Sequence, residues 1–537
     1  MSITDANIIP ANSILNADVC IIGGGAAGIT VASELNGLQK LVCLIESGSY
    51  SPDDGLQSLY DIDVFGYPIR ENFMSRARYL GGTCNLWAGR GMKLTEFDFQ
   101  KREWVSNSGW PLAYHELENY YGKAAKILRL PSFEDFQNFA LNRGFSQTES
   151  ALFNNSDLKP NIALWGKKPL RFGAAYKSSL ARSRNVKVYL NANVTEIILN
   201  PEGTSVNELT IMTLNGNRIV LRANTFVLAC GGMENARLLL VSRGVQDHGI
   251  GNRFDIVGRF FMDHPRVVFG KIQLFRGQRL PLLLAVPLRD GMGQIGIQLS
   301  ENTQRKEQLL NNYVTLEREW SPRTAMAYQS FVHSMKIILR RGYSGNRFTF
   351  SDVKLAKIPE LIYLLAPREL IPHFIYRIFK AARGRLRSDP SELIIVNYCE
   401  QAPNPASRVF LSEKRDKLNM NRLVLDWKVG PEETRTLVRL QELLSQYLQK
   451  NNIGSLKIDG SELNALSYTD ASHHIGTTRM SDSPRTGVVD KNCKVHGVRN
   501  LFVAGSSIFP TSGYANPTWT IVALALRLAK HLQNQFC

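Results

Sequence analysis

Two histidines stand side by side in the stretch ASHHIGTTRM, residues 471–480. A neutral imidazole titrates near physiological pH, so histidine is well suited to taking a proton from a hydroxyl group. The chain before the Gly-Thr-Thr turn is expected to be extended, and neighbours on an extended chain point to opposite faces. At most one of His473 and His474 can therefore face a given ligand. The alternative is that both are ordinary polar residues near a turn.

A second chemical signature lies in ADVCIIGGGAAGITVASELNGLQKLVCLIESG, residues 17–48. The apolar run 19–22 is short and β-branched, which is typical of a buried parallel strand. It leads into a glycine turn and a helix expected from residue 26 to about residue 38, followed by a second apolar strand, LVCLI. Strand, glycines, helix and strand in this order predict a dinucleotide-binding unit.

Each residue of the signature has a physical task. Gly23 allows a tight turn, Gly25 lets the backbone approach a pyrophosphate, and Gly28 lets the helix pack closely on the strand. The helix N-terminus offers free N–H groups to the phosphates. Glu46 ends the second strand, where it can accept hydrogen bonds from an adenosine ribose. This acid disfavours NADP but does not distinguish FAD from NAD, and a purely structural glycine turn is the alternative.

The length of 537 residues and the hydrophobic content of 44% predict a folded protein of two or three domains, or one large domain with an insertion. No segment reaches about eighteen uninterrupted apolar residues, and so no membrane span is expected. The first nineteen residues lack the basic start and apolar run of a secretory signal.

Seven cysteines occur without any CxxC pair, a pattern unlike a disulfide framework or a zinc or iron–sulfur site. We expect most of them to be buried small hydrophobic residues in a reducing, cytoplasmic compartment, and we expect no metal. The net charge of +17 is high, but no nucleic-acid-binding module accompanies it, so no nucleic-acid partner is predicted.

Further motifs follow the glycine turn in a fixed order: RYLGGTCNLWAGR (78–90), SGWP (108–111), FVLACGGMENARLLL (226–240), VGRFFMDHP (257–265), EQAPNPASRVFLS (400–412), HHIGTTRM (473–480) and NLFVAGSSIFPTSGYANPTWTIVALALRLA (500–529). Together they resemble the glucose–methanol–choline (GMC) family of FAD-dependent oxidoreductases, in particular its bacterial and pyranose-oxidase-like members. The resemblance runs from about residue 17 to residue 533 and weakens in the middle.

In that family an H-x-x-G-T segment carries the catalytic histidine, three residues before the glycine. The resemblance therefore selects His473 and leaves His474 as its outward-facing neighbour. The second member of the family's active-site pair matches Asn516, whose other interpretation is a plain helix cap before Pro517. By comparison, His264 and His496 are expected to be structural.

The resemblance also implies a cofactor site for FAD. The segment 81–89 resembles the loop that passes over the flavin, and relatives with covalently attached FAD carry a histidine where this chain has Leu86. We therefore predict dissociable FAD. The residues implied in FAD binding are Gly23, Gly25, Ala26, Gly28, Glu46, Gly81, Gly82, Asn85, Trp87, Ala88, Val194, Gly231, Gly505, Ser506, Asn516, Pro517 and Thr518.

The predicted fold class is α/β, with a Rossmann-like FAD-binding domain in three pieces, 1–100, 170–265 and 465–537. An α+β substrate domain over 266–464 is expected to hold an antiparallel sheet that includes the strand-like stretches IIVNYCEQ and SRVFLS. Residues 101–169 are expected to connect or cover the two domains.

The predicted reaction is oxidation of a CH–OH group of an alcohol, sugar or glycoside. His473 would take the hydroxyl proton, the flavin N5 the hydride, and Asn516 would donate a hydrogen bond to the oxygen. A flavin-retaining lyase and a noncatalytic flavin-binding protein are the alternatives. The electron acceptor is not identified, and no CxxCH haem site is present to relay electrons.

An insert at 326–387 within the substrate domain is rich in basic and apolar residues, with twelve Lys or Arg and three Asp or Glu between Lys336 and Arg387. One interpretation is a peripheral contact with the inner face of an anionic membrane, which would admit an amphiphilic substrate. The other is a lid or oligomer contact with a solvated basic face.

Overall fold

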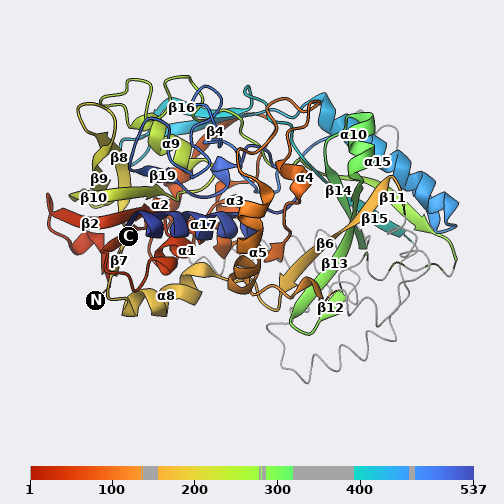
Figure 1. The fold of residues 1–537 in the computed structure, drawn as a ribbon, viewed down its shortest axis with the longest axis horizontal. Coiled ribbons are helices and arrows are strands. Elements are labelled where there is room, and N and C mark those ends of the chain that lie inside the picture. Colours follow the sequence, from red (N-terminus) through yellow and green to blue (C-terminus); the bar gives the residue numbers. More distant parts are fainter. Residues whose placement is uncertain are drawn as a thin grey trace, which may run out of the picture.

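Two eight-stranded β-sheets organise the chain, and Figure 1 shows them on the left and on the right of the molecule. The N- and C-terminal ends both lie beside the left-hand sheet. This computed structural model describes residues 2–134, 136, 155–276, 278, 280, 283, 286–318, 392–458 and 466–536.

The first sheet is mainly parallel, with the strand order β1-β7-β3-β2-β10-β9-β8 and β19 beside β10. Strands β9 and β8 extend it in an antiparallel manner. Strand β3 and the last four residues of β2 are buried on both faces, which explains their uninterrupted apolar sequence. The bounds are β1 (Ile3–Asp5), β7 (Val186–Leu190), β3 (Val42–Ile45), β2 (Ile14–Ile22), β10 (Arg218–Leu228), β9 (Val206–Met212), β8 (Asn193–Leu199) and β19 (Leu501–Val503).

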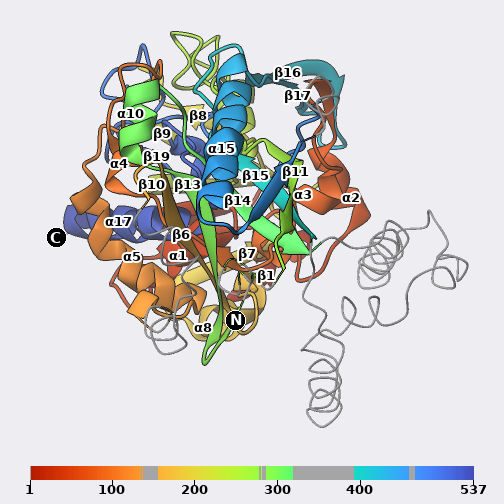
Figure 2. The same ribbon diagram turned by 90° about the vertical axis from the view of Figure 1, so that its right-hand side faces the viewer.

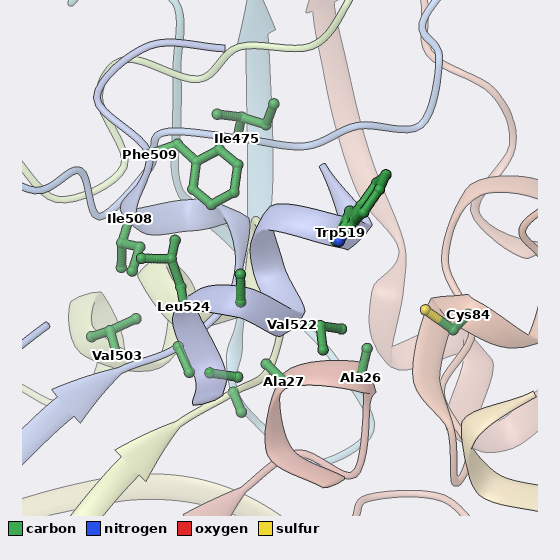
Figure 3. Packing of buried hydrophobic residues seen from close by; sticks show 14 of the residues in the cluster. Ala26, Ala27, Cys84, Ile475, Val503, Ile508, Phe509, Trp519, Val522 and Leu524 are labelled. Atoms are coloured by element: carbon green, nitrogen blue, oxygen red, sulfur yellow. The ribbon is translucent and has the colours of Figure 1, made fainter. Parts of the chain in front are cut away.

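Helices cover this sheet, with the C-terminal helix α17 packed between α1 and α5. Figure 3 shows Val522 of α17 directed toward the turn of α1 that carries Ala26 and Ala27. The small alanine side chains let the two helices approach closely. The bounds are α1 (Ala26–Glu34), α5 (Tyr114–Leu128), α8 (Phe172–Arg182), α9 (Glu234–Val241) and α17 (Thr518–Phe536). Helix α1 ends before residue 38, the limit predicted from sequence.

The second sheet is antiparallel throughout, with the order β18-β11-β15-β14-β13-β6-β5 and β12 beside β13. This confirms the prediction of an antiparallel sheet. The bounds are β18 (Gly454–Lys457), β11 (Arg266–Leu274), β15 (Glu392–Cys399), β14 (Asn312–Arg318), β13 (Gly291–Leu299), β12 (Val286–Leu288), β6 (Leu158–Gly166) and β5 (Arg90–Gly91).

Helix α15 (Pro431–Lys450) lies across the second sheet, as Figure 2 shows. Its buried leucines, Leu437, Leu440, Leu443, Leu444 and Leu448, recur at the spacing of one helix face. Proline at the first helical position and the bond from the Gly430 N–H to Glu433, at 2.9 Å, define the start of the helix.

A small third sheet has the order β16-β17-β4, with bounds β16 (Arg408–Arg415), β17 (Asn421–Trp427) and β4 (Ile62–Gly66). The stretch SRVFLS forms β16 and thus pairs antiparallel, but in this sheet and not in the large one. The remaining elements are α2 (Asp54–Gln57), α3 (Asn72–Ser75), α4 (Glu96–Phe99), α10 (Glu301–Glu307), η1 (Ala6–Ile8), η2 (Ser58–Tyr60), η3 (Gly82–Asn85) and η4 (Ser506–Ile508).

Among the described residues, no helix is both long enough and apolar enough to cross a bilayer. Cys20, Cys43, Cys84, Cys399 and Cys493 are buried free thiols, and Cys230 is a half-buried one. The insert 326–387 lies outside the described residues.

Candidate active site

A cavity of about 630 Å³ extends from the glycine turn after β2 to the edge of the second sheet. Its wall includes Gly25 at the start of α1, together with His473 and Asn516. A volume of this size lies within the range of natural ligand sites. The glycine signature and the histidine stretch, far apart in the sequence, therefore face the same space.

Two of the three glycines of the turn, Gly23 and Gly28, are required by its geometry. Gly23 has φ +106°, a conformation that residues with a side chain rarely adopt. A Cβ at Gly28 would lie 1.9 Å from the carbonyl oxygen of Gly23, so only glycine lets α1 pack here. At Gly25 the nearest atom to a Cβ would be the Cα of Gly82, at 3.9 Å. The turn therefore leaves an open backbone surface at the N-terminus of α1.

Glu46 follows β3 and lines the cavity, but its carboxylate also supports the turn. Its Oε2 accepts the N–H of Gly24 at 2.8 Å and its Oε1 accepts the N–H of Gly48 at 2.7 Å. Burial raises the pKa of Glu46, and these N–H donors oppose the rise. The carboxylate therefore holds the backbone at Gly24 and at Gly48 and also lines the cavity.

The side chain of His473 is held from two sides. Its Nδ1 lies 2.9 Å from Nδ1 of His264, whose Nε2 lies 3.0 Å from the carbonyl oxygen of Gly513. Because a carbonyl only accepts, neutral His264 carries its proton on Nε2 and accepts from His473 through Nδ1. His473 is thus protonated on Nδ1 and presents the Nε2 lone pair, 3.1 Å from Nδ2 of Asn516. The contact with His264 fixes the tautomer of a base.

Both histidines of this contact are held neutral. Burial lowers the pKa of His473 well below 6.5, and the neighbouring His264, Arg70 and Arg90 lower it further. Burial lowers the pKa of His264 to about 4. The neutral form of His473, which is the form that accepts a proton, therefore persists at mildly acidic pH.

Asp263 joins the segments that carry the two histidines. Its Oδ2 accepts the N–H of His473 at 2.8 Å, and its Oδ1 accepts those of Ala471 at 2.9 Å and His264 at 2.6 Å. Burial raises the pKa of Asp263, and these N–H donors oppose the rise. Sequence analysis did not single out Asp263, although it lies in the motif that carries His264.

The prediction that His474 faces outward is wrong. His474 is buried, and it lines the same cavity as His473. His474 is 8% exposed and its ring lies 5.8 Å from that of Phe261, while its backbone presses against Gly232. Burial lowers its pKa to about 3. As predicted, His496 lies apart from the histidines of the cavity: it is not one of the described residues that form the wall, and its Nε2 lies 3.0 Å from the carbonyl oxygen of Ser481.

The interpretation of Asn516 as a helix cap does not fit the structure. Helix α17 begins at Thr518, and the carbonyl of Pro517 accepts its first hydrogen bond, from Ile521 at 2.8 Å. Asn516 precedes this cap, and its Oδ1 is buried without a partner among the described residues. An unsatisfied buried acceptor beside the cavity suits a ligand that donates to it.

The segment 81–89 is anchored by two of its side chains. Asn85 donates from Nδ2 to the carbonyl of Leu80 at 3.0 Å, and Trp87 donates from Nε1 to that of Leu170 at 2.8 Å. Leu86 and Trp87 line the cavity, whereas Asn85 does not. Asn85 therefore stabilises the conformation of the loop without lining the cavity.

Most of the other residues implied in cofactor binding also form the cavity wall: Gly23, Ala26, Gly82, Ala88, Val194, Gly231, Gly505, Ser506, Pro517 and Thr518. Gly28 and Gly81 are not part of the wall. At Gly231 and Gly505 a Cβ would meet no atom within 4 Å, so both leave room on the cavity side.

Sequence analysis missed the residues that the second sheet contributes to the cavity. Arg90 of β5, Trp165 of β6, Arg266 of β11 and Tyr398 of β15 all belong to the wall. Arg90 is the last residue of the motif RYLGGTCNLWAGR, so its place in that motif could have indicated a role at the site. The other three reach the cavity only through strand pairing.

Comparison with known proteins agrees with this architecture. The sequence models of the GMC oxidoreductase family match residues 17–266 and 403–525. Paromamine 6'-oxidase of Streptomyces fradiae is 26% identical, over 96% of this chain and 90% of that protein. The fructose dehydrogenase large subunit of Gluconobacter japonicus is 24% identical, over 98% of this chain and 99% of that protein. The crystal structure of pyridoxine 4-oxidase from Mesorbium loti has a TM-score of 0.53 at 18% identity, over 97% and 99% of the two chains.

The chain belongs to the GMC oxidoreductase family, a family of flavoproteins whose members oxidise alcohol and sugar CH–OH groups. This confirms the resemblance drawn from the motifs and the predicted class of enzyme.

Proposed function

We propose that this chain oxidises a CH–OH group of a small-molecule alcohol or sugar, with His473 as the general base. The observation that carries the proposal is the contact between His473 and His264. This hydrogen bond leaves the Nε2 lone pair of His473 beside Asn516 at the cavity wall. Such a neutral imidazole is suited to taking a hydroxyl proton.

FAD is the cofactor that fits the other end of the cavity. The open backbone at Gly25, the N-terminus of α1 and the space beside Gly231 and Gly505 suit a pyrophosphate, and Glu46 and Val194 suit the adenosine. When bound, FAD supplies the hydride acceptor. Attachment is proposed to be noncovalent, because Leu86 offers no nucleophile.

The chain's own residues divide the remaining work. His473 Nε2 takes the hydroxyl proton, and the Nδ1–H bond to His264 keeps the ring oriented while the imidazolium forms. The Asn516 amide donates to the oxygen on which negative charge develops. Asp263 holds the backbones of both histidines and thereby sets the distance between them.

Anaerobic titration of the FAD-loaded protein tests the proposal. Oxidised-flavin absorbance is followed while pyranosides, polyols and simple alcohols are added to the wild type, His473→Ala and His496→Ala. We expect one class of alcohol to bleach the wild type and His496→Ala at similar rates. Bleaching of His473→Ala should be slower by about 10²–10⁴-fold, the usual contribution of a general base.

Two results would contradict the proposal. Equal bleaching in His473→Ala would remove His473 as the base. Turnover of a compound without any reduction of a flavin that dithionite reduces readily would favour the flavin-retaining lyase.

The domain limits and cellular context complete the proposal. We keep 1–100, 170–265 and 465–537 as the FAD-binding domain and 266–464 as the substrate domain, joined by 101–169, although β6 and β5 add strands from outside 266–464 to the second sheet. The free thiols among the described cysteines favour a reducing, cytoplasmic location. The electron acceptor is a separate, unidentified partner.

A further inference from the structure

The cavity wall carries five arginines, and they differ in whether an acid neutralises them. Glu234 lies 3.3 Å from both Arg78 and Arg237, and Asp470 lies 3.9 Å from Arg70. The remaining two, Arg90 and Arg266, have no acid within ion-pair distance among the described residues. Both stand on strands of the second sheet, away from the glycine turn.

A row of aromatic rings positions these two guanidinium groups. Arg266 pairs with Tyr398 across β11 and β15, and Tyr398 pairs with Tyr313 across β15 and β14. Direct partners on neighbouring strands point to the same face. The two tyrosine rings stack with centroids 4.9 Å apart, and the row is continued by Arg90, which lies 5.5 Å from the Tyr313 centroid.

Arg90 is held over aromatic rings without satisfying its hydrogen bonds. Its guanidinium carbon lies 5.0 Å from the Trp165 centroid and 5.7 Å from that of Tyr398. Its Nε and Nη2 are buried without a hydrogen-bond partner among the described residues. A buried charged donor without a partner is costly, so the site favours a ligand that supplies negative charge.

Both unneutralised guanidinium groups border the ring of Tyr398. The Arg266 guanidinium carbon is 5.9 Å from the Tyr398 centroid, the same ring that Arg90 approaches. Like charges repel, and an oxyanion bound by both arginines would remove that repulsion. Arg90 and Arg266 line the same cavity as His473, the proposed base.

We propose that Arg90 and Arg266 bind an anionic group, a carboxylate or a phosphate, of the alcohol that is oxidised. The substrate class is then a hydroxy acid or an acidic sugar, whose ring or chain stacks on Trp165 and Tyr398. This inference rests on the proposed function, because it names the substrate of that same cavity. It adds a specificity site that the neutral alcohols of the general reaction do not require.

Three unreactive probes that share a phenyl ring test the site: benzoate, phenyl phosphate and the uncharged benzamide. Binding to the FAD-loaded protein is followed by perturbation of the flavin spectrum, and binding to the flavin-free protein by tryptophan fluorescence, since Trp165 lines the site. We expect at least one of the two anions to bind about tenfold more tightly than benzamide, as charged hydrogen bonds require. The preferred anion distinguishes carboxylate from phosphate.

Arg90→Gln and Arg266→Gln should each remove the preference for the anion, whereas Arg90→Lys should keep part of it. Arg222→Gln is the matched control, because Arg222 is exposed on β10 and pairs with Glu208 at 2.9 Å. Equal binding of benzamide and both anions by the wild type would overturn the inference. So would an anion preference that survives in both glutamine variants.

A second panel, made of oxidisable sugars, separates this inference from the proposed function. Glucose, glucuronate and glucose 6-phosphate are compared as reductants of the flavin, and an acidic member is expected to react fastest. If no alcohol reduces the flavin but the anion preference depends on Arg90 and Arg266, the proposed function fails and the anion site stands. If neutral alcohols alone reduce it and no anion binds, the anion site fails and the proposed function stands.

Discussion

The two ends of the cavity are built in different ways. The turn at the centre of the glycine end comes from one continuous stretch, in which Gly23, Gly25 and Gly28 connect β2 and α1. The histidine end draws on segments far apart in the chain, among them those of Arg90, His264 and His473. The first end depends on local backbone geometry, and the second depends on side chains that the tertiary structure brings together.

The largest effect is expected from a methyl group at the glycine end. In Gly28→Ala the new Cβ would lie 1.9 Å from the carbonyl oxygen of Gly23, so β2 and α1 would have to separate. We expect loss of bound FAD and destabilisation by more than about 1–3 kcal/mol, the cost of overpacking. Flavin content after gel filtration and urea unfolding measure both.

Gly122→Ala is the matched control for Gly28→Ala. Gly122 lies in helix α5, and a Cβ there would meet no atom within 4 Å. Alanine in a helix interior is favoured over glycine by about 1 kcal/mol, so this variant should be as stable as the wild type or more stable. Full flavin content in Gly28→Ala would show that the glycine end is less dependent on close packing than the geometry implies.

At the histidine end, His264→Ala should slow flavin reduction without releasing FAD. His473 would keep its position in the chain but lose the partner that fixes its tautomer. We expect a loss of roughly tenfold, smaller than the 10²–10⁴-fold expected for removal of the base itself. Stopped-flow reduction rates at saturating substrate measure it.

The pH profile of His264→Ala distinguishes positioning from general damage. The His264 ring is one of the causes that lower the pKa of His473, after burial. Without it the pKa of His473 should rise, and the acidic limb of the rate profile should move to higher pH. A uniformly slower enzyme with an unchanged profile would argue against the positioning role.

A smaller effect is expected from His474, the buried neighbour of His473. Its pKa is lowered to about 3 in the folded state from 6.5, so the unfolded chain takes up a proton first as the pH falls. The stability that depends on neutral His474 is therefore complete above about pH 6.5 and is lost progressively below it. At pH 5 the loss is about 2 kcal/mol at 1.36 kcal/mol per pH unit.

His474→Phe tests this dependence. The variant should lose less stability than the wild type between pH 7.5 and pH 5 in urea unfolding, because one proton uptake is removed. The free energy of unfolding of the variant should still fall somewhat with falling pH, since His264 also has a lowered pKa. An identical pH dependence in the two proteins would mean that His474 takes up a proton as readily in the folded state as in the unfolded state.

The smallest effect concerns the loop that connects the two ends. Trp87→Phe removes the donor to the carbonyl of Leu170 and keeps an aromatic ring. We expect destabilisation by about 1 kcal/mol, the net value of one hydrogen bond, and only a small loss of FAD affinity, because an aromatic ring stays at the cavity wall. Thermal unfolding measures the first and flavin titration the second.

The sequence alone determined the glycine end and the identity of the histidine segment. Strand, turn and helix follow from contacts between residues that are close in the chain, so their order and spacing are legible without a structure. The helix limit at about residue 38 and the outward direction of His474 were predicted wrongly. The first depends on packing at the helix end, and the second on what covers the far side of the strand-like segment.

Only the tertiary structure decided the partners of His473 and the charge at the second sheet. The sequence says that His264 follows Asp263, but the contact with His473 exists because the two segments bridge at Met262 and Ile475. Likewise, Arg90 and Arg266 meet around Tyr398 through the register of an antiparallel sheet. Strand register and long-range pairing are set by the packing of the whole chain, and no local pattern of residues encodes them.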